Sequence, residues 1–209
     1  MADVAEMHKR VVGLKMNIIV ETNWMNKQMH KGIKKHYQSL KQTCESNGVE
    51  FIGLYKPLND AWNWTHFIKV NTLEKWRDID REVHRLYPDI DNNVICSMSR
   101  LYRGIGGLRT PPIRDPKSMK YLVVGLNNFT EINLGIEYYN QRCEQFEDLE
   151  GAGLLGIYAP NSESWDWATI KLYDSIDRYL DVGMEYQKTH RRIPELTSYT
   201  ERIYEKYEP

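Results

Sequence analysis

The feature that most constrains this chain is an internal repeat. The segment IGLYKPLNDAWNWT at 52–65 returns as LGIYAPNSESWDWA at 155–168, an offset of 103 residues. The chain has only six tryptophans, so two Trp-x-Trp units in register indicate a duplication and not chance. The agreement places five pairs at equivalent positions: Gly53 with Gly156, Tyr55 with Tyr158, Pro57 with Pro160, Trp62 with Trp165, and Trp64 with Trp167.

The repeat divides the 209 residues into two copies of one unit. We expect an N-terminal extension at 1–13, a first copy at 14–104, a linker at 105–116 and a second copy at 117–209. Each copy is of a size that ordinarily forms a small domain.

The spacing of apolar residues alternates between strand-like and helix-like patterns, in the same order along each copy. In the first copy, the apolar and β-branched stretch at 16–22 predicts a strand, and apolar residues three and four apart over 29–44 predict a helix. Two short strands, a second helix to about residue 86 and a last strand at 93–103 follow. The second copy repeats this order, which is the β-α-β-β-α-β arrangement of a ferredoxin-like unit.

This topology predicts an α+β fold with an antiparallel sheet and both helices on one sheet face. The other face must also be covered, so we expect the two sheets to pack face to face and close a barrel. In this respect the chain resembles the dimeric α/β-barrel superfamily in a fused, pseudo-dimeric form. The resemblance is one of architecture and matches no single family.

The superfamily resemblance implies a range of activities. Members include antibiotic-biosynthesis-type monooxygenases without a cofactor, polyketide cyclases, lactone isomerases, haem-degrading enzymes and chlorite-dismutase-like haem proteins. Their small-molecule pocket lies between the sheet and the helices of one unit. The chlorite-dismutase-like pattern needs an axial histidine in the second unit, where the only histidine, His190, stands beside two arginines. That position argues against a buried haem ligand.

The composition of the chain limits the classes of molecule that it can bind. The net charge of -1 provides no basic field for nucleic acid or an anionic membrane, so we expect neither partner. Three widely spaced cysteines without a CxxC pair fit a reducing compartment, and no apolar run reaches the roughly 18 residues of a membrane span. Together with the absence of a signal-peptide pattern, these features predict a cytoplasmic protein.

Candidate catalytic residues come from positions where the copies differ. His36 and His66 stand where the second copy has Tyr139 and Thr169. His36 lies on the apolar stripe of the first helix, and a neutral histidine can remove a proton from a phenol or an acidic carbon. The alternative is a half-exposed His36 and a hydrogen-bonded core His66.

Aromatic and amide side chains supply the candidate substrate-binding residues. Alternation along the strand puts Trp62 and Trp64 on the same face as His66, and Tyr55 is a further candidate for one shared pocket. Their repetition in both copies equally suits a scaffold role. Asn23 and Trp24, at the end of the first strand, could orient a ligand carbonyl, although asparagine there also suits a turn or cap.

These observations lead to a functional hypothesis with alternatives. We expect a small-molecule enzyme, a monooxygenase or a cyclase/isomerase, acting on a hydrophobic aromatic or polyketide-like substrate by histidine-assisted proton abstraction. No metal site is expected, since no His-x-x-x-His or Glu-x-x-His unit occurs, and no cofactor is expected, with haem as the alternative. A haem-binding or haem-processing protein, and a non-catalytic ligand-binding or assembly protein, remain alternatives, and homo-oligomerisation is left open.

Overall fold

Each copy of the repeat forms its own set of strands and helices in the computed structural model. The structure describes residues 18–26, 32–86, 94–105, 118–131, 134–161, 163–189 and 196–208. The predicted extension at 1–13 and nearly all of the predicted linker at 105–116 lie outside these residues. The contacts divide the chain into unit 1, which is Met1–Lys56, Ala61–Leu108 and Tyr207–Pro209, and unit 2, which is Pro57–Asp60 and Arg109–Lys206.

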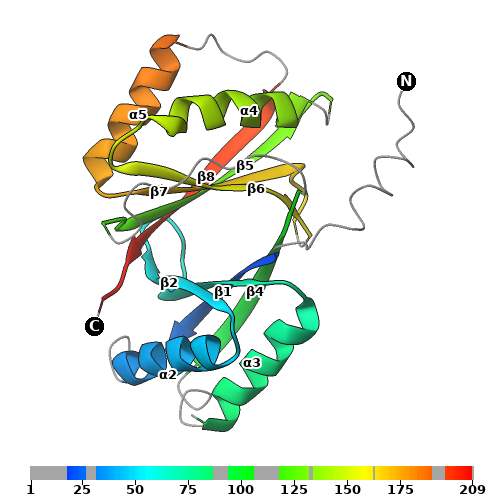
Figure 1. The fold of residues 1–209 in the computed structure, drawn as a ribbon, viewed down its shortest axis with the longest axis vertical. Coiled ribbons are helices and arrows are strands. Elements are labelled where there is room, and N and C mark those ends of the chain that lie inside the picture. Colours follow the sequence, from blue (N-terminus) through cyan, green and yellow to red (C-terminus); the bar gives the residue numbers. More distant parts are fainter. Residues whose placement is uncertain are drawn as a thin grey trace. The chain divides into compact units, whose positions relative to one another are not determined.

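Unit 1 has the predicted β-α-β-β-α-β order (Figure 1). Its antiparallel sheet runs β4-β1-β3-β2, with both helices on one face. The strands are rich in β-branched and aromatic residues, which favour extended backbone. The elements are β1 (Ile18–Asn26), α2 (Ile33–Ser46), β2 (Glu50–Pro57), β3 (Trp64–Val70), α3 (Leu73–Leu86) and β4 (Val94–Gly104).

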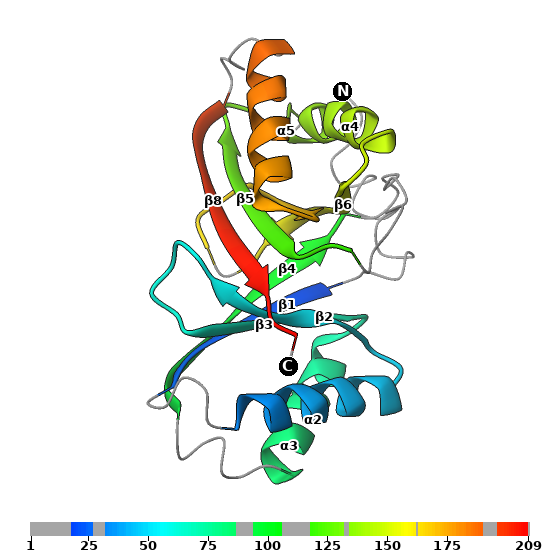
Figure 2. The ribbon, with the colours of Figure 1, turned by 90° about the vertical axis from the view of Figure 1, so that its left-hand side faces the viewer.

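Unit 2 repeats the arrangement, with strand order β8-β5-β7-β6 and its two helices together on one face (Figure 2). Its elements are β5 (Tyr121–Phe129), α4 (Leu134–Glu147), β6 (Ala152–Pro160), β7 (Trp167–Tyr173), α5 (Ile176–Thr189) and β8 (Leu196–Lys206). The α+β class and the two tandem ferredoxin-like units are therefore confirmed.

None of the helices that the structure describes has both the length and the apolar character needed to cross a bilayer.

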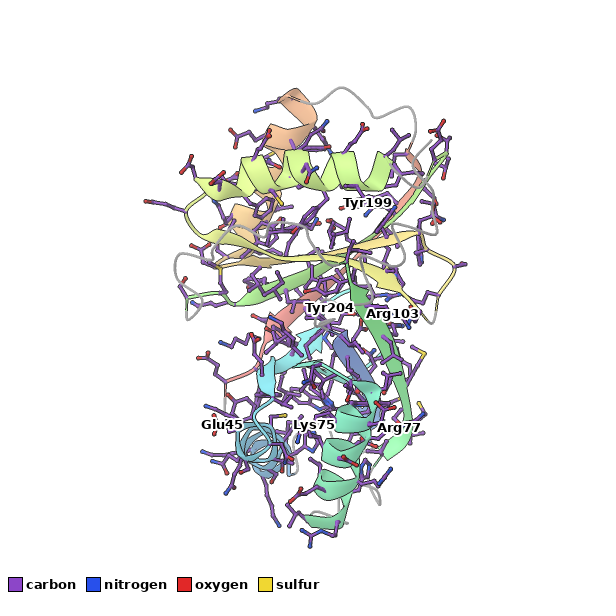
Figure 3. All side chains as sticks on the ribbon, turned by 45° about the vertical axis from the view of Figure 1, so that its right-hand side comes forward. Glu45, Lys75, Arg77, Arg103, Tyr199 and Tyr204 are labelled. Carbon is purple, nitrogen blue, oxygen red and sulfur yellow. The ribbon has the colours of Figure 1, made fainter. Side chains whose placement is uncertain are left out.

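Local signals in the sequence set the element boundaries in both copies. The turn after α2 needs a left-handed residue, which Gly48 supplies with φ 64°, and Gly151 with φ 69° does the same after α4. The backbone N–H of Lys75 donates to Thr72 Oγ1 at the start of α3. Lys75 Nζ also donates to Asn47 Oδ1, 3.0 Å away, and so joins α3 to the end of α2 (Figure 3).

Strand alternation sorts the residues of β1 onto two faces. Ile18 and Val20 pack with Leu40 of α2 and Ile79 of α3, so even-numbered residues of β1 face the helices. On the opposite face the carboxylate of Glu21, which is fully buried, accepts hydrogen bonds from Arg100, Tyr102 and Asn23. A fully buried carboxylate is tolerated only when it is paired in this way. The face of a strand residue therefore decides whether it can reach a pocket under the helices.

Gly32 and Gly135 are equivalent at the repeat offset of 103 residues, but the two copies need glycine there for different reasons. Gly32 precedes α2 with φ 83°, and a Cβ there would meet nothing within 4 Å. Its counterpart Gly135 lies within α4 over the ring of Trp167, where a Cβ would stand 2.1 Å from Nε1. The second copy thus needs glycine for close approach, and the first needs it for a left-handed turn.

This packing predicts opposite effects for two glycine-to-alanine changes in unit 2. Gly135→Ala would drive a methyl group into Trp167 and lower the free energy of unfolding by about 1 to 3 kcal/mol. Gly183→Ala, in α5 with nothing within 4 Å, is the matched control and should be neutral or stabilising by up to about 1 kcal/mol. Urea unfolding followed by circular dichroism measures both. Equal stabilities of the two variants would contradict the close contact.

Candidate functional site

A cavity of about 240 Å³ lies between the sheet and the helices of unit 1. It is the kind of position in which the superfamily resemblance predicts a small-molecule pocket. The lining combines imidazole and indole rings with aliphatic side chains and three hydroxyls. The rings belong to Trp24, His36, His66, Trp76 and His84, and the hydroxyls to Thr22, Ser97 and Ser99.

The register of the sheet brings distant parts of the sequence to this cavity. In β1, Thr22 lies opposite His66 of β3 on one side and Ser99 of β4 on the other. All three lie on the helix-facing side of the sheet and line the cavity. The hydroxyls of Thr22 and Ser99 are 3.1 Å apart and hydrogen-bonded.

Two histidines and a tryptophan form the centre of the site. His36 comes from the buried face of α2 and His66 from β3, and each residue is only 7% exposed. Their ring centroids are 6.1 Å apart. The Trp24 ring contacts both, with centroid distances of 4.6 Å to His36 and 5.4 Å to His66. The three rings therefore form one cluster at the cavity.

Three of the four imidazole nitrogens of this cluster have no hydrogen-bond partner among the described residues. Nδ1 and Nε2 of His36 and Nδ1 of His66 are buried, and no side chain or backbone group of the described residues hydrogen-bonds to them. A buried polar group without a partner destabilises a fold by about 1 to 3 kcal/mol. Unsatisfied groups that face a cavity are therefore ready to bind a hydrogen-bonding molecule.

Burial also fixes the charge of both histidines. Burial, with a smaller contribution from the nearby His84, lowers the pKa of His36 to about 4. The pKa of His66 lies well below its ordinary value, first because of burial and then because of repulsion from His36 and His84. Both rings are thus neutral at pH 7, and each carries one donor nitrogen and one acceptor nitrogen.

The structure brings together three of the seven residues singled out in the sequence. Trp24, His36 and His66 line the cavity, whereas the other four lie elsewhere. Trp64 is on the same sheet face but is fully buried in the neighbouring core with Ile33 and Leu54.

The remaining three candidates lie away from the cavity. Asn23 faces away from the helices, donates to Glu21 and accepts from Thr65. Tyr55 packs edge-on against Phe67, and Trp62 is a half-buried residue that precedes β3.

Sequence reasoning missed the contribution of α3. Trp76, Asp80 and His84 line the cavity four residues apart on one side of the helix. His84 Nδ1 lies 2.7 Å from the carbonyl oxygen of Asp80 and 3.7 Å from its Oδ1, with both side chains nearly half exposed. The pair thus belongs to the solvent side of the cavity. The spacing of Trp76, Asp80 and His84 was the available signal.

The described residues contain no group of three or more histidine, cysteine, aspartate or glutamate side chains placed to hold a metal ion.

The cavity lined by His66 is evidence against the alternative of an assembly protein whose aromatic residues form only core and interfaces.

Comparison with known proteins shows the fold. No protein-family model and no curated protein sequence matches the chain. Among solved structures, a mutant chlorite dismutase from Candidatus Nitrospira defluvii is 9% identical, with a TM-score of 0.62 over 96% of this chain and 95% of that one. A proposed monooxygenase from Fusobacterium nucleatum is 11% identical, with a TM-score of 0.64 over 94% of each chain. Another proposed monooxygenase, from Lactobacillus acidophilus, is 7% identical, with a TM-score of 0.62 over 90% of this chain and 93% of that one.

These likenesses confirm the tandem ferredoxin-like fold that the architectural resemblance predicts, while the low identities transfer no activity. One chlorite dismutase structure is a complex with imidazole and another a complex with cyanide, so proteins of this fold hold small molecules.

The comparison also corrects the expectation of no cofactor. Chlorite dismutases, which share this fold, depend on haem, so the fold does not support the expectation of a protein without a cofactor. Haem requires an axial ligand, partners for two propionates and room for a macrocycle. The unit 1 cavity offers imidazoles, but its 240 Å³ is below the roughly 300 to 1,000 Å³ of pockets for drug-sized ligands. The part of its lining that the structure describes includes Asp80 and no lysine or arginine.

A cavity of about 570 Å³ in unit 2 fails the same test for a different reason. The described residues that line it include Arg142 and Lys171 but no histidine or cysteine. Tyrosine binds iron as a phenolate, and burial raises the pKa of Tyr173, Tyr179 and Tyr186. Neither cavity fits haem with the residues that the structure describes, so we derive no chemical step through it.

The buried histidines predict a stability that falls in acid. The pKa of His36 is about 4 when folded and 6.5 when unfolded, so between these values the unfolded chain binds more protons. The free energy of unfolding should therefore fall as the pH drops from 7 to 4.5, by about 2 to 3 kcal/mol from His36 alone. His36→Gln should remove this contribution. Urea unfolding at both pH values tests it, and equal pH dependence in wild type and variant would refute it.

Proposed function

We propose that this chain is a small-molecule enzyme whose unit 1 cavity removes a proton from an aromatic or conjugated substrate, as the first step of a monooxygenase, cyclase or isomerase reaction. The observation that carries this proposal is the pair of neutral, buried imidazoles, of which both ring nitrogens of His36 and Nδ1 of His66 have no hydrogen-bond partner among the described residues. The monooxygenase assignments of two proteins with this fold are consistent with it.

The size and polarity of the cavity limit the substrate. A volume of 240 Å³ corresponds to about eight water molecules at roughly 30 Å³ each. This space suits a compound of one or two rings better than a multi-ring polyketide. The indoles of Trp24 and Trp76 and the aliphatic side chains favour a flat apolar body. Thr22, Ser97 and Ser99 provide hydroxyls for a polar edge.

The two imidazoles can share the proton transfer. A ring with a bare nitrogen accepts the proton as the O–H or C–H bond of the substrate breaks, and the electron pair stays on the substrate as a phenolate or enolate. The N–H of the other ring can donate a hydrogen bond to the developing oxyanion. Because burial makes an imidazolium unfavourable in the empty cavity, protonation should become favourable only beside the substrate anion. This arrangement couples proton transfer to substrate binding.

Deuterium exchange into 2-tetralone tests the chemistry directly. This two-ring ketone has acidic C–H bonds, and their exchange in D₂O is followed by NMR without knowledge of the natural substrate. The wild-type protein should accelerate exchange over buffer, and His36→Gln and His66→Gln should each lower the acceleration by about 10²-fold or more. Lys34→Gln, on the exposed side of α2, is the matched control and should exchange as fast as wild type. Exchange no faster than in buffer would refute proton abstraction from this substrate class.

The pH profile of the same exchange identifies the base. The pH dependence of kcat/KM reports the free enzyme, so the acid limb should have its midpoint near pH 4, the pKa of His36, and not near 6.5. Because His84 contributes to lowering this pKa, His84→Gln should move the midpoint upward. A midpoint at 6.5 in both proteins would exclude His36 as the base.

A further inference from the structure

The cavity of unit 2 carries charges that neither the fold nor the proposed reaction requires. It lies between β7, β8 and the helices α4 and α5, and its volume is about 570 Å³. The side chains at its wall include Arg142 from α4, Lys171 from β7 and Glu201 from β8. At the repeat offset of 103, Arg142 and Lys171 correspond to Ser39 and Ile68 in unit 1. The second copy therefore has two buried cations at positions where the first has none.

One of the two cations is neutralised within the protein. Lys171 Nζ donates to Glu201 Oε1 at 2.5 Å, and the ammonium-bearing side chain is only 5% exposed. Tyr179 Oη donates to the other carboxylate oxygen. Burial alone would raise the pKa of Glu201, but the Lys171 ammonium and these hydrogen bonds lower it to about 2. Lys171 and Glu201 are thus both charged, and they contribute no net charge to the cavity.

Among the described residues that line the cavity, Arg142 is the cation without an acidic partner. The residue is 8% exposed, and its Nε and Nη2 donate to Tyr138 Oη at 3.0 and 2.9 Å, while Nη1 donates to Gln145 Oε1 at 2.7 Å. These partners are neutral, and within the described part of the chain no carboxylate forms an ion pair with it. Two of its five N–H groups remain for a ligand. The guanidinium carbon lies 3.4 Å from the centroid of the Tyr186 ring, which offsets part of the unfavourable burial.

Apart from Gln187, the other described lining residues are aromatic or apolar. Leu180, Met184 and Tyr199 are large side chains with 52%, 52% and 43% exposure, and all three lie at this cavity. Tyr199, on β8, is labelled in Figure 3. Tyrosine rings and an apolar entrance favour a flat hydrophobic body, and the positive charge of Arg142, which no described carboxylate matches, favours one anionic group.

We propose that the unit 2 cavity binds an aromatic monocarboxylate whose carboxylate accepts hydrogen bonds from Arg142. The aromatic body lies among the tyrosine rings, and Leu180 and Met184 stand at the entrance. Guanidinium and carboxylate are matched in shape and charge, and the low polarity around Arg142 strengthens the pairing. This site uses none of the histidines of unit 1 and is independent of the proton abstraction proposed there.

Isothermal titration calorimetry of the full chain with 2-naphthoate tests this site. The neutral analogue 2-naphthalenemethanol has the same rings without the charge and should bind at least about tenfold more weakly. Arg142→Gln should lose at least about tenfold in affinity for 2-naphthoate. Arg178→Gln is the matched control, because Arg178 lies on α5 outside the lining and donates to the carbonyl of Glu150. His36→Gln should bind 2-naphthoate as wild type does, which separates this site from the unit 1 cavity.

Two changes at the entrance keep the test decisive if Arg142→Gln does not fold. Met184 is exposed, so its replacement leaves the core intact. Met184→Glu should weaken 2-naphthoate binding by about threefold and Met184→Lys should strengthen it, with the difference shrinking at about 1 M NaCl. Equal affinity for 2-naphthoate and its alcohol in the wild-type protein, or equal affinity of M184E and M184K for 2-naphthoate, would overturn the proposal.

Discussion

Both helices of each unit pack on the same face of its sheet, and this constraint governs everything that the two cavities can contain. A strand side chain reaches a cavity only if it points to the helix-covered face, and successive residues alternate between faces. In β1, Thr22 and Trp24 therefore join the unit 1 cavity, whereas Glu21 and Asn23 enter a buried polar network on the other face. Two neighbouring residues of one strand thus belong to separate environments.

The two cavities handle buried polar groups in different ways. In unit 1 burial keeps both imidazoles neutral, so neither ring carries a charge that needs a partner, and each can accept or donate a proton. In unit 2 the charges persist, because Lys171 and Glu201 neutralise each other and Arg142 lies against the Tyr186 ring. The duplicated unit has therefore produced two chemically different pockets on one backbone plan. Neither pocket has the described residues that the haem of the structurally similar chlorite dismutases would require.

Residues that agree between the two copies are residues that the fold requires, but the agreement does not show why the fold requires them. Trp64 and Trp167 are both buried scaffold, as their repetition suggested. Gly32 and Gly135 also agree, yet one adopts a left-handed conformation and the other allows the close approach of a tryptophan. Divergence is the more informative signal for chemistry. His36 and His66, which are replaced by other residue types in the second copy, lie at one cavity, and Arg142 and Lys171, which are replaced in the first copy, lie at the other.

The sequence by itself determined the duplication, the element order and the clustering of helices on one face, because these follow from local periodicity and from one repeated pattern. It also pointed to His36 and His66, because the copies differ there and because a helix stripe and a strand face can be counted along the chain, and to Trp24, because it ends the first strand. Only the tertiary structure decided that Tyr55 and Asn23 turn away, that Trp76 and His84 join from α3, and that Arg142 has no ion-pair partner among the described residues. Those outcomes depend on strand register and helix packing, which bring together residues tens of positions apart and are not encoded in any short segment.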